Sequence, residues 1–165
     1  MNKTDSQFSV LFDTSFLIRL TNRNDVLHNN AYKYFEYFLN ERITCMVSTI
    51  AIAEYCVKGR IQELPLENLQ IVPFVINHAI EAGRLCSIVL EEINKCDTKI
   101  TPRSVIPNDT KMFAQANTVK NVKYFVSSDT EASKIFNILK NKANVHFDFL
   151  DINIPHTEKF GLLFD

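Results

Sequence analysis

The sequence has 165 residues, of which 46% are hydrophobic and 22% are charged, and its formal net charge is −1. This balance is typical of a globular protein, and we predict a single domain over residues 1–165, with its core at about residues 8–152 and a tail at residues 153–165. No apolar run reaches the ~18 residues of a membrane span, and residues 1–7 lack the apolar centre of a secretory signal. We therefore expect a cytoplasmic protein with no membrane segment.

Apolar, strand-like runs alternate with amphipathic helical patterns along the chain. The predicted strands cover residues 8–12, 43–47, 70–74, 122–128 and 144–152. The predicted helices cover residues 14–20, 26–40, 50–57, 76–90 and 106–116, and a further helix follows residue 129. Residues 94–103 are polar and contain a proline, which predicts a loop. This alternation predicts an α/β domain with a mostly parallel central sheet.

The cysteines and glycines exclude several kinds of site. Cys45, Cys56, Cys86 and Cys96 are dispersed and form no C-x-x-C pair, so we expect reduced thiols rather than disulfides or a zinc site. The three glycines form no Gly-rich phosphate loop, which disfavours a nucleotide cofactor.

Asp13 and Asp129 each follow an apolar strand directly and precede a predicted helix. Open α/β sheets bind their ligands beside the carboxyl ends of the strands, so both carboxylates are candidate metal ligands. Each of them is also well placed to cap the helix that follows, and this alternative stays open.

Two further acids lie on predicted helices. Glu54 is the one charged residue in an apolar helix, where an ionised carboxylate is costly unless it binds metal or forms an ion pair; the alternative is a pair with Lys58, four residues further on. Asp109 lies in the first turn of the helix that Pro107 helps to begin, where the helix dipole favours a negative charge. It is a candidate ligand or a helix cap.

The chemistry of these four acids favours one kind of site. Carboxylates without a histidine or cysteine among them are hard oxygen ligands, which suit Mg²⁺ or Mn²⁺. Clustered carboxylates raise one another's pKa values, and a cation keeps them ionised. A divalent ion in such a cluster activates water and neutralises a departing oxyanion, which is the chemistry of phosphodiester hydrolysis. The same acids also suit a metal-dependent phosphatase or a DNA nuclease.

The charges are unevenly distributed along the chain. Residues 95–142 contain nine lysines and arginines against four acids, whereas the segments on either side are both net negative. A basic segment that contains two of the candidate acids fits a site for a polyanion. The alternative is a solvated lysine face.

The order and flanks of the four acids resemble the PIN-domain family, metal-dependent ribonucleases that include the VapC-type toxins. The matching stretches are residues 11–17, 50–55, 107–116 and 125–130. The resemblance implies a three-layer α/β/α PIN-like fold with a mostly parallel central sheet. It also implies that Asp13, Glu54, Asp109 and Asp129 bind Mg²⁺ or Mn²⁺ and carry catalysis.

Two neighbouring positions are possible auxiliary residues of this site. Ser128 matches the hydroxyl residue often found before the last acid of the family. Many relatives place a further Asp or Asn two residues after that acid, where this chain has Glu131. We expect Glu131 to start the helix, and contact with the metal through water is the alternative.

The resemblance also implies a biological context. It predicts an endoribonuclease that acts on RNA as the toxin of a toxin–antitoxin pair, is held inactive by a small antitoxin protein, and forms a homodimer. The alternative from another class is a non-catalytic PIN-like module that binds RNA or another protein. The complete set of acids counts against this module, because an idle site has no reason to retain buried charges.

Overall fold

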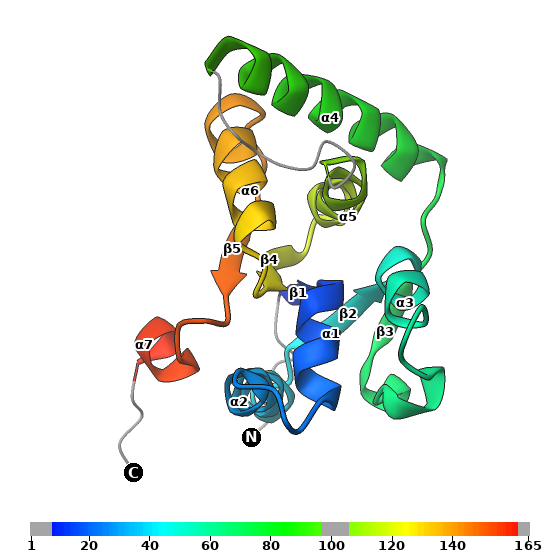
Figure 1. The fold of residues 1–165 in the computed structure, drawn as a ribbon, viewed down its shortest axis with the longest axis vertical. Helices are drawn as coiled ribbons and strands as arrows, with labels where there is room; N and C mark the ends of the chain where they lie inside the picture. Colours follow the sequence, from blue (N-terminus) through cyan, green and yellow to red (C-terminus); the bar gives the residue numbers. More distant parts are fainter. Residues whose placement is uncertain (1–7, 97–105, 162–165) are drawn as a thin grey trace, which may run out of the picture.

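A five-stranded sheet forms the centre of the molecule (Figure 1) in a computed structural model that describes residues 8–96 and 106–161. The strand order is β3-β2-β1-β4-β5, and every neighbouring pair is parallel. The strands are β1 (Ser9–Phe12), β2 (Thr44–Ser48), β3 (Gln70–Val72), β4 (Val122–Ser127) and β5 (Asp148–Asp151). The predicted parallel sheet is confirmed.

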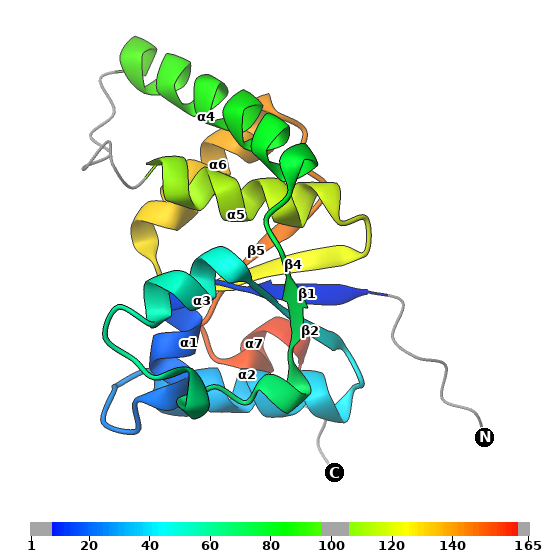
Figure 2. The same ribbon diagram turned by 90° about the vertical axis from the view of Figure 1, so that its right-hand side faces the viewer.

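Helices cover both faces of the sheet, which gives the predicted three-layer α/β/α architecture. The helices are α1 (Thr14–Thr21), α2 (His28–Asn40), α3 (Thr49–Tyr55), α4 (Ile76–Cys96), α5 (Ile106–Thr118), α6 (Thr130–Lys142) and α7 (His156–Phe160), with short 3₁₀ helices at Ile61–Glu63 and Leu66–Asn68. Figure 2 shows α4, α5 and α6 on one side of the sheet and α1, α2 and α7 on the other. Within residues 8–96 and 106–161, no helix is long and apolar enough to cross a membrane.

The central strand is buried on both faces, as its apolar sequence predicts. All four residues of β1 are buried, and Phe12 is paired in register with Val47 of β2 and Val126 of β4. The Phe12 ring stacks on Phe16 of α1 with a centroid distance of 4.1 Å. This contact fixes the start of α1 against the end of β1, where Asp13 lies.

The order of the strands determines where a site can form. The chain adds β2 and β3 on one side of β1 and β4 and β5 on the other, so the topology switches between β1 and β4. Open α/β sheets bind ligands at this switch point, beside the carboxyl ends of the strands. Asp13 follows β1 here, and Asp129 follows β4.

The structure differs from the predicted elements in several places. The helix expected directly after Asp25 begins at His28, because the Asp25 side chain accepts a hydrogen bond from the Leu27 amide and forms a turn instead. Helix α4 continues to Cys96, and the last strand is shorter than predicted. The rest of the loop predicted at residues 94–103 falls outside the described residues.

The predicted tail contains a packed element. Helix α7 lies in the segment that we assigned to the tail, and its Phe160 ring stacks on Tyr37 of α2 with a centroid distance of 4.6 Å. The sequence of this segment is too short to show a helical repeat, and a tertiary contact holds it in place. Cys45, Cys56 and Cys86 are free thiols, as predicted.

Candidate metal centre

One hollow at the carboxyl edge of the sheet brings together all four acids that we predicted from the sequence. It has a volume of about 450 Å³, and it is lined by Asp13, Thr14, Ser15, Ile18, Glu54, Asn108, Asp109 and Asp129. These residues come from the beginnings of α1, α5 and α6 and from the end of α3. Four segments that are far apart in the sequence therefore meet around one space.

Asp13 caps α1 and is fixed by three hydrogen bonds. Its Oδ1 accepts from the Thr14 amide at 2.7 Å, and its Oδ2 accepts from the hydroxyls of Ser15 at 2.7 Å and Ser127 at 2.6 Å. Burial raises the pKa of Asp13, and these hydrogen bonds oppose part of that rise. The predicted cap is present, and the carboxylate lines the hollow as well.

Ser15 and Ser127 tie the ends of β1 and β4 together. The Ser15 hydroxyl accepts from the Ser128 amide at 3.0 Å, and the Ser127 hydroxyl accepts from the Asp129 amide at 3.0 Å. Ser128 was the predicted auxiliary residue, but it is the Ser127 hydroxyl that bonds to Asp13, whereas the Ser128 hydroxyl is buried without a hydrogen-bond partner. Successive side chains of a strand point to opposite faces of the sheet, so alternation along the predicted strand at residues 122–128 could have distinguished the two serines.

Glu54 is held at the hollow by its neighbour across the site. The Thr14 hydroxyl donates to Glu54 Oε2 at 2.5 Å. Helix α3 ends at Tyr55, so Lys58 does not lie one helical turn after Glu54, and no ion pair between the two is found among the described residues. The alternative of a Glu54–Lys58 pair is therefore wrong.

Asp109 is a buried acid with an oxygen that accepts no hydrogen bond. It is only 7% exposed, and its Oδ2 is buried without a hydrogen-bond partner. Burial, together with the smaller effect of the charges of Asp13, Asp129, Glu54 and Glu131, raises its pKa to about 8. A buried carboxylate that faces three other acids and lacks a donor is in an environment that a cation would stabilise.

Asp129 and Glu131 begin α6. Asp129 caps the helix, because its Oδ1 accepts from the amides of Glu131 at 2.8 Å and Ala132 at 3.4 Å. Glu131 lies in the first helical turn, and its Oε1 pairs with Lys134 at 2.5 Å. This agrees with our expectation that Glu131 starts the helix, and it does not line the hollow.

The side chains around the hollow fit a hard divalent cation in their chemistry. They offer carboxylate oxygens together with the hydroxyl of Thr14 and the amide of Asn108, and no thiol or imidazole. In the part of the chain that the structure describes, no three acidic, histidine or cysteine side chains are already arranged to hold one ion. Metal binding by Asp13, Glu54, Asp109 and Asp129 therefore stays a prediction.

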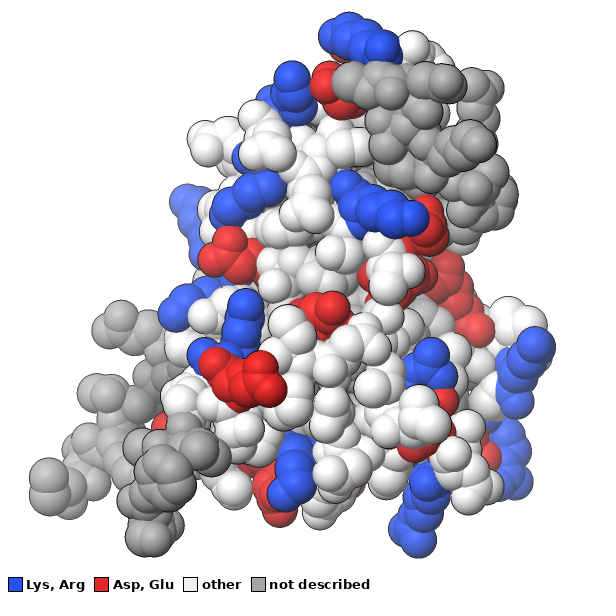
Figure 3. Space-filling view, turned by 60° about the vertical axis from the view of Figure 1, so that its left-hand side comes forward, with Lys and Arg blue, Asp and Glu red and all other residues white. Residues whose placement is uncertain are grey.

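The lysines of the basic segment are dispersed rather than gathered into one field. Lys134, Lys140 and Lys142 pair with Glu131, Asp148 and Glu92. Figure 3 shows lysine and arginine side chains interspersed with acidic ones over one face of the molecule. Lys111 follows two lining residues of the hollow, Asn108 and Asp109, closely in the sequence. Its Nζ donates to Asn108 Oδ1 at 3.3 Å.

The fold and the four acids at its switch point define a PIN-like α/β/α domain. Two solved structures share this fold. A chain of VapBC2 from Rickettsia felis, in a crystal structure with a DNA fragment from its promoter, is 19% identical, and the match covers 87% of this chain and all of that chain with a TM-score of 0.57. A chain of DNA-bound VapBC from Salmonella typhimurium is 13% identical, and the match covers 88% of this chain and 98% of that chain with a TM-score of 0.52.

These comparisons confirm the predicted resemblance at the level of the fold. No family model matches the sequence, and no curated protein matches it. The likeness therefore lies in the arrangement of helices and strands, and most side chains differ.

Proposed function

We propose that this protein is a Mg²⁺- or Mn²⁺-dependent endoribonuclease that hydrolyses RNA phosphodiester bonds. The observation that carries the proposal is the hollow in which Asp13, Glu54, Asp109 and Asp129 meet at the switch point of a PIN-like sheet. The unpartnered Oδ2 of Asp109 supports it, because a buried anionic oxygen needs either a donor or a cation.

The residues of the chain have distinct roles in this proposal. Asp13, Glu54, Asp109 and Asp129 would hold the ion, which when bound supplies activation of water and charge neutralisation at the phosphate. Ser15 and Ser127 fix the orientation of Asp13, and Thr14 fixes that of Glu54. These hydrogen bonds keep the carboxylates of Asp13 and Glu54 in place.

Cleavage assays with and without metal test the proposal. We expect the wild type to cleave single-stranded RNA with Mg²⁺ or Mn²⁺ and to lose this activity in EDTA. The variant Asp13→Asn should be inactive even when the metal is present. Asn is a good helix cap, so this variant removes a charge while α1 keeps its start. Equal cleavage by the wild type and the variant would contradict the assignment of the acids.

The substrate panel separates the alternatives. RNA, single-stranded DNA, duplex DNA and a small phosphate ester distinguish a ribonuclease from a DNA nuclease and from a phosphatase. The absence of cleavage with every metal, combined with RNA binding, would favour a non-catalytic module.

We further propose that the ribonuclease is the toxin of a toxin–antitoxin pair. The support comes from the two VapBC structures that share the fold, each of them a complex on DNA. Induced expression of the wild type should arrest bacterial growth, and Asp13→Asn should not. A small antitoxin protein would be the partner that relieves the arrest.

We also propose that the chain forms a homodimer through α4. Ile76 is 72% exposed and Ile80 is 68% exposed, and they share one helix face with Ala79, Gly83 and Leu90. An exposed apolar helix face of this kind is typical of a protein interface. Light scattering should report a dimer, and Ile80→Glu should convert it to a monomer.

A further inference from the structure

Two further hollows continue from the candidate metal centre along α1. The first has a volume of about 580 Å³ and shares Ile18 and Glu54 with the metal hollow. The second has a volume of about 590 Å³ and shares Thr21 and Glu63 with the first. We call these two hollows the α1 groove. With ~1.5 Å of helical rise per residue, the path from Thr14 to Thr21 is ~10 Å long.

The near part of the α1 groove combines apolar surface with positive charge at its edge. Ile18 is 43% exposed and Val57 is 78% exposed, although both are apolar. Lys58 lines the same hollow beside Gly59, whereas the exposed Arg60 side chain pairs with Glu63 at 3.0 Å. Apolar surface for bases and cations for phosphates are the two features that single-stranded nucleic acid requires.

The far part of the α1 groove contains aromatic rings and another cation. Tyr32 is 50% exposed, and its ring lies 6.3 Å from that of His28 between centroids. Arg23 is exposed at the same hollow, whose floor includes the buried side chains of Leu20 and Phe35. An exposed tyrosine ring that lines the same hollow as an arginine offers a base a surface on which to stack and its phosphate a cation.

The two residues that line both hollows, Thr21 and Glu63, are held by hydrogen bonds to Tyr55. The Tyr55 hydroxyl donates to Glu63 Oε2 at 3.0 Å, and its oxygen lies 3.0 Å from Thr21 Oγ1. These bonds connect the end of α3, the end of α1 and the first 3₁₀ helix. The shape of the groove therefore does not depend on a bound ligand.

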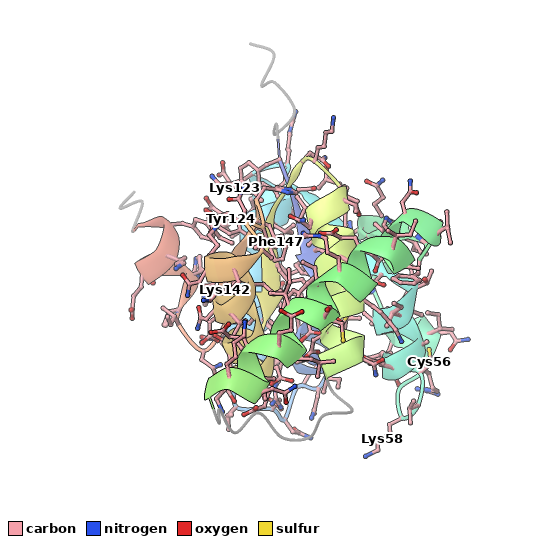
Figure 4. All side chains as sticks on the ribbon, turned by 90° about the horizontal axis from the view of Figure 1, so that it is seen from above. Cys56, Lys58, Lys123, Tyr124, Lys142 and Phe147 are labelled. Atoms are coloured by element: carbon pink, nitrogen blue, oxygen red, sulfur yellow. The ribbon has the colours of Figure 1, made fainter. Side chains whose placement is uncertain are left out.

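We propose that the α1 groove binds the single-stranded RNA that the candidate metal centre cleaves, with a base stacked on Tyr32 and backbone phosphates at Arg23 and Lys58. The inference rests on the proposed function, because a strand with one phosphate at the acids must leave the metal hollow over its neighbours. Continuity with that hollow favours RNA over a polypeptide as the occupant. Figure 4 shows Lys58 on the side of the molecule away from Lys123 and Tyr124, which gives a control surface.

RNA binding by variants in an Asp13→Asn background tests the groove without any cleavage. The probe is a fluorescein-labelled single-stranded RNA of about 12 nucleotides and mixed sequence, measured by anisotropy and compared with one of about 4 nucleotides. We expect Tyr32→Ala to weaken binding of the longer RNA about 10-fold, because it removes one stacking surface, and Tyr32→Phe to retain the affinity. Arg23→Ala should reduce the dependence of log K on log salt concentration by about 1.

A control variant and two further outcomes separate the groove from the proposed nuclease activity. Lys123→Ala also removes one cation but lies at the opposite end of β4 from the site, so it should leave the affinity for the longer RNA within about 2-fold. Unchanged affinity in both Tyr32→Ala and Arg23→Ala would overturn the groove, even if a polypeptide were then found to bind there. The wild type could also fail to cleave RNA while Tyr32→Ala and Arg23→Ala still weaken RNA binding. That combination would support the groove and contradict the nuclease.

Discussion

At the scale of single residues, the buried carboxylates of Asp13 and Asp109, whose pKa values are both raised, act against the stability of the metal-free protein when they are ionised. Asp109 shows this most clearly, since it is buried, lacks a donor at Oδ2 and faces other carboxylates. A stable fold would favour an apolar or amide side chain at this position. The retention of a carboxylate there is understandable if the residue is used when a cation is bound.

Replacement of Asp109 by Asn should stabilise the metal-free protein at alkaline pH. The pKa of Asp109 is about 8 in the folded chain, above its ordinary value of 3.8, so between these pH values the folded chain binds a proton that the unfolded chain does not. Its contribution to stability therefore falls as the pH rises from about 4 to about 8. In urea unfolding with EDTA, Asp109→Asn should gain roughly 1–3 kcal/mol at pH 8 and little at pH 4.

A surface acid provides the control for this change. Asp148 is exposed and pairs with Lys140, so Asp148→Asn should change the free energy of unfolding by less than about 0.5 kcal/mol at both pH values. If Asp109→Asn were instead less stable than the wild type at pH 8, the ionised carboxylate would stabilise the fold, which contradicts this prediction.

Thr14 is expected to position Glu54 for the ion. Its hydroxyl donates to Glu54 Oε2, and a hydrogen bond to a charged group contributes roughly 1.5–3 kcal/mol. Thr14→Val keeps the shape but removes this donor, so calorimetry should show Mn²⁺ affinity reduced about 10-fold, while Thr14→Ser retains it. Thr118→Val removes a comparable hydroxyl at the end of α5 and should leave Mn²⁺ binding unchanged.

The acids of the site could be predicted from the sequence, but the hydrogen bonds that hold them in place could not. Acids after apolar strands, and one acid inside an apolar helix, stand out in a sequence because they conflict with their neighbours. The Ser127 hydroxyl does not stand out, because its role depends on the pairing of β4 with β1, over a hundred residues away in the sequence. Hydroxyl networks of this kind become visible only when the strands have been aligned.

At the scale of helices and strands, local signals predicted the starts of elements better than their ends. Ser48 caps α3 through the Ile50 amide at 2.9 Å, as a serine before a helical run should. The last strand and α4 have different lengths from those predicted, because strand pairing and packing against α5 decide where they end. Helix α7 has five residues and too little sequence pattern to be recognised.

Helix α7 should depend on one aromatic contact. Phe160 stacks on Tyr37 at 4.6 Å between centroids, whereas the His156 ring lies 5.9 Å from that of Tyr34 and 6.0 Å from that of Tyr37, so Phe160 makes the closer ring contact between α7 and α2. We expect Phe160→Ala to lower the free energy of unfolding by roughly 1–2 kcal/mol, measured by urea denaturation. Lys159→Ala removes an exposed neighbour and should have little effect, and equal stability of the two variants would mean that α7 is not docked through Phe160.

At the scale of the whole molecule, the topology of the sheet is what brings the acids together. Alternating strands and helices predict a parallel sheet, and a parallel sheet places all its carboxyl ends at one edge. The strand order cannot be obtained from the pattern alone, since it depends on which strands pair across long connections. With β1 between β2 and β4, the acids that follow β1 and β4 are neighbours, and α3 and α5 bring Glu54 and Asp109 to them.

Metal binding should therefore be linked to the pH stability of the entire fold. Below about pH 8 the carboxyl of Asp109 is protonated in the metal-free chain, so an ion that binds there must displace a proton. We expect the affinity for Mn²⁺ to fall about 10-fold for each pH unit below 8, and the increase in melting temperature caused by Mn²⁺ to shrink in parallel. Thermal unfolding of the wild type with and without Mn²⁺ at pH 6, 7 and 8, roughly spanning this range, measures the linkage.

Asp109→Asn has no such proton to displace, so any stabilisation by Mn²⁺ that remains in this variant should vary less steeply with pH. A Mn²⁺ effect with the same pH dependence in both proteins would contradict Asp109 as the source of the proton that is released on binding.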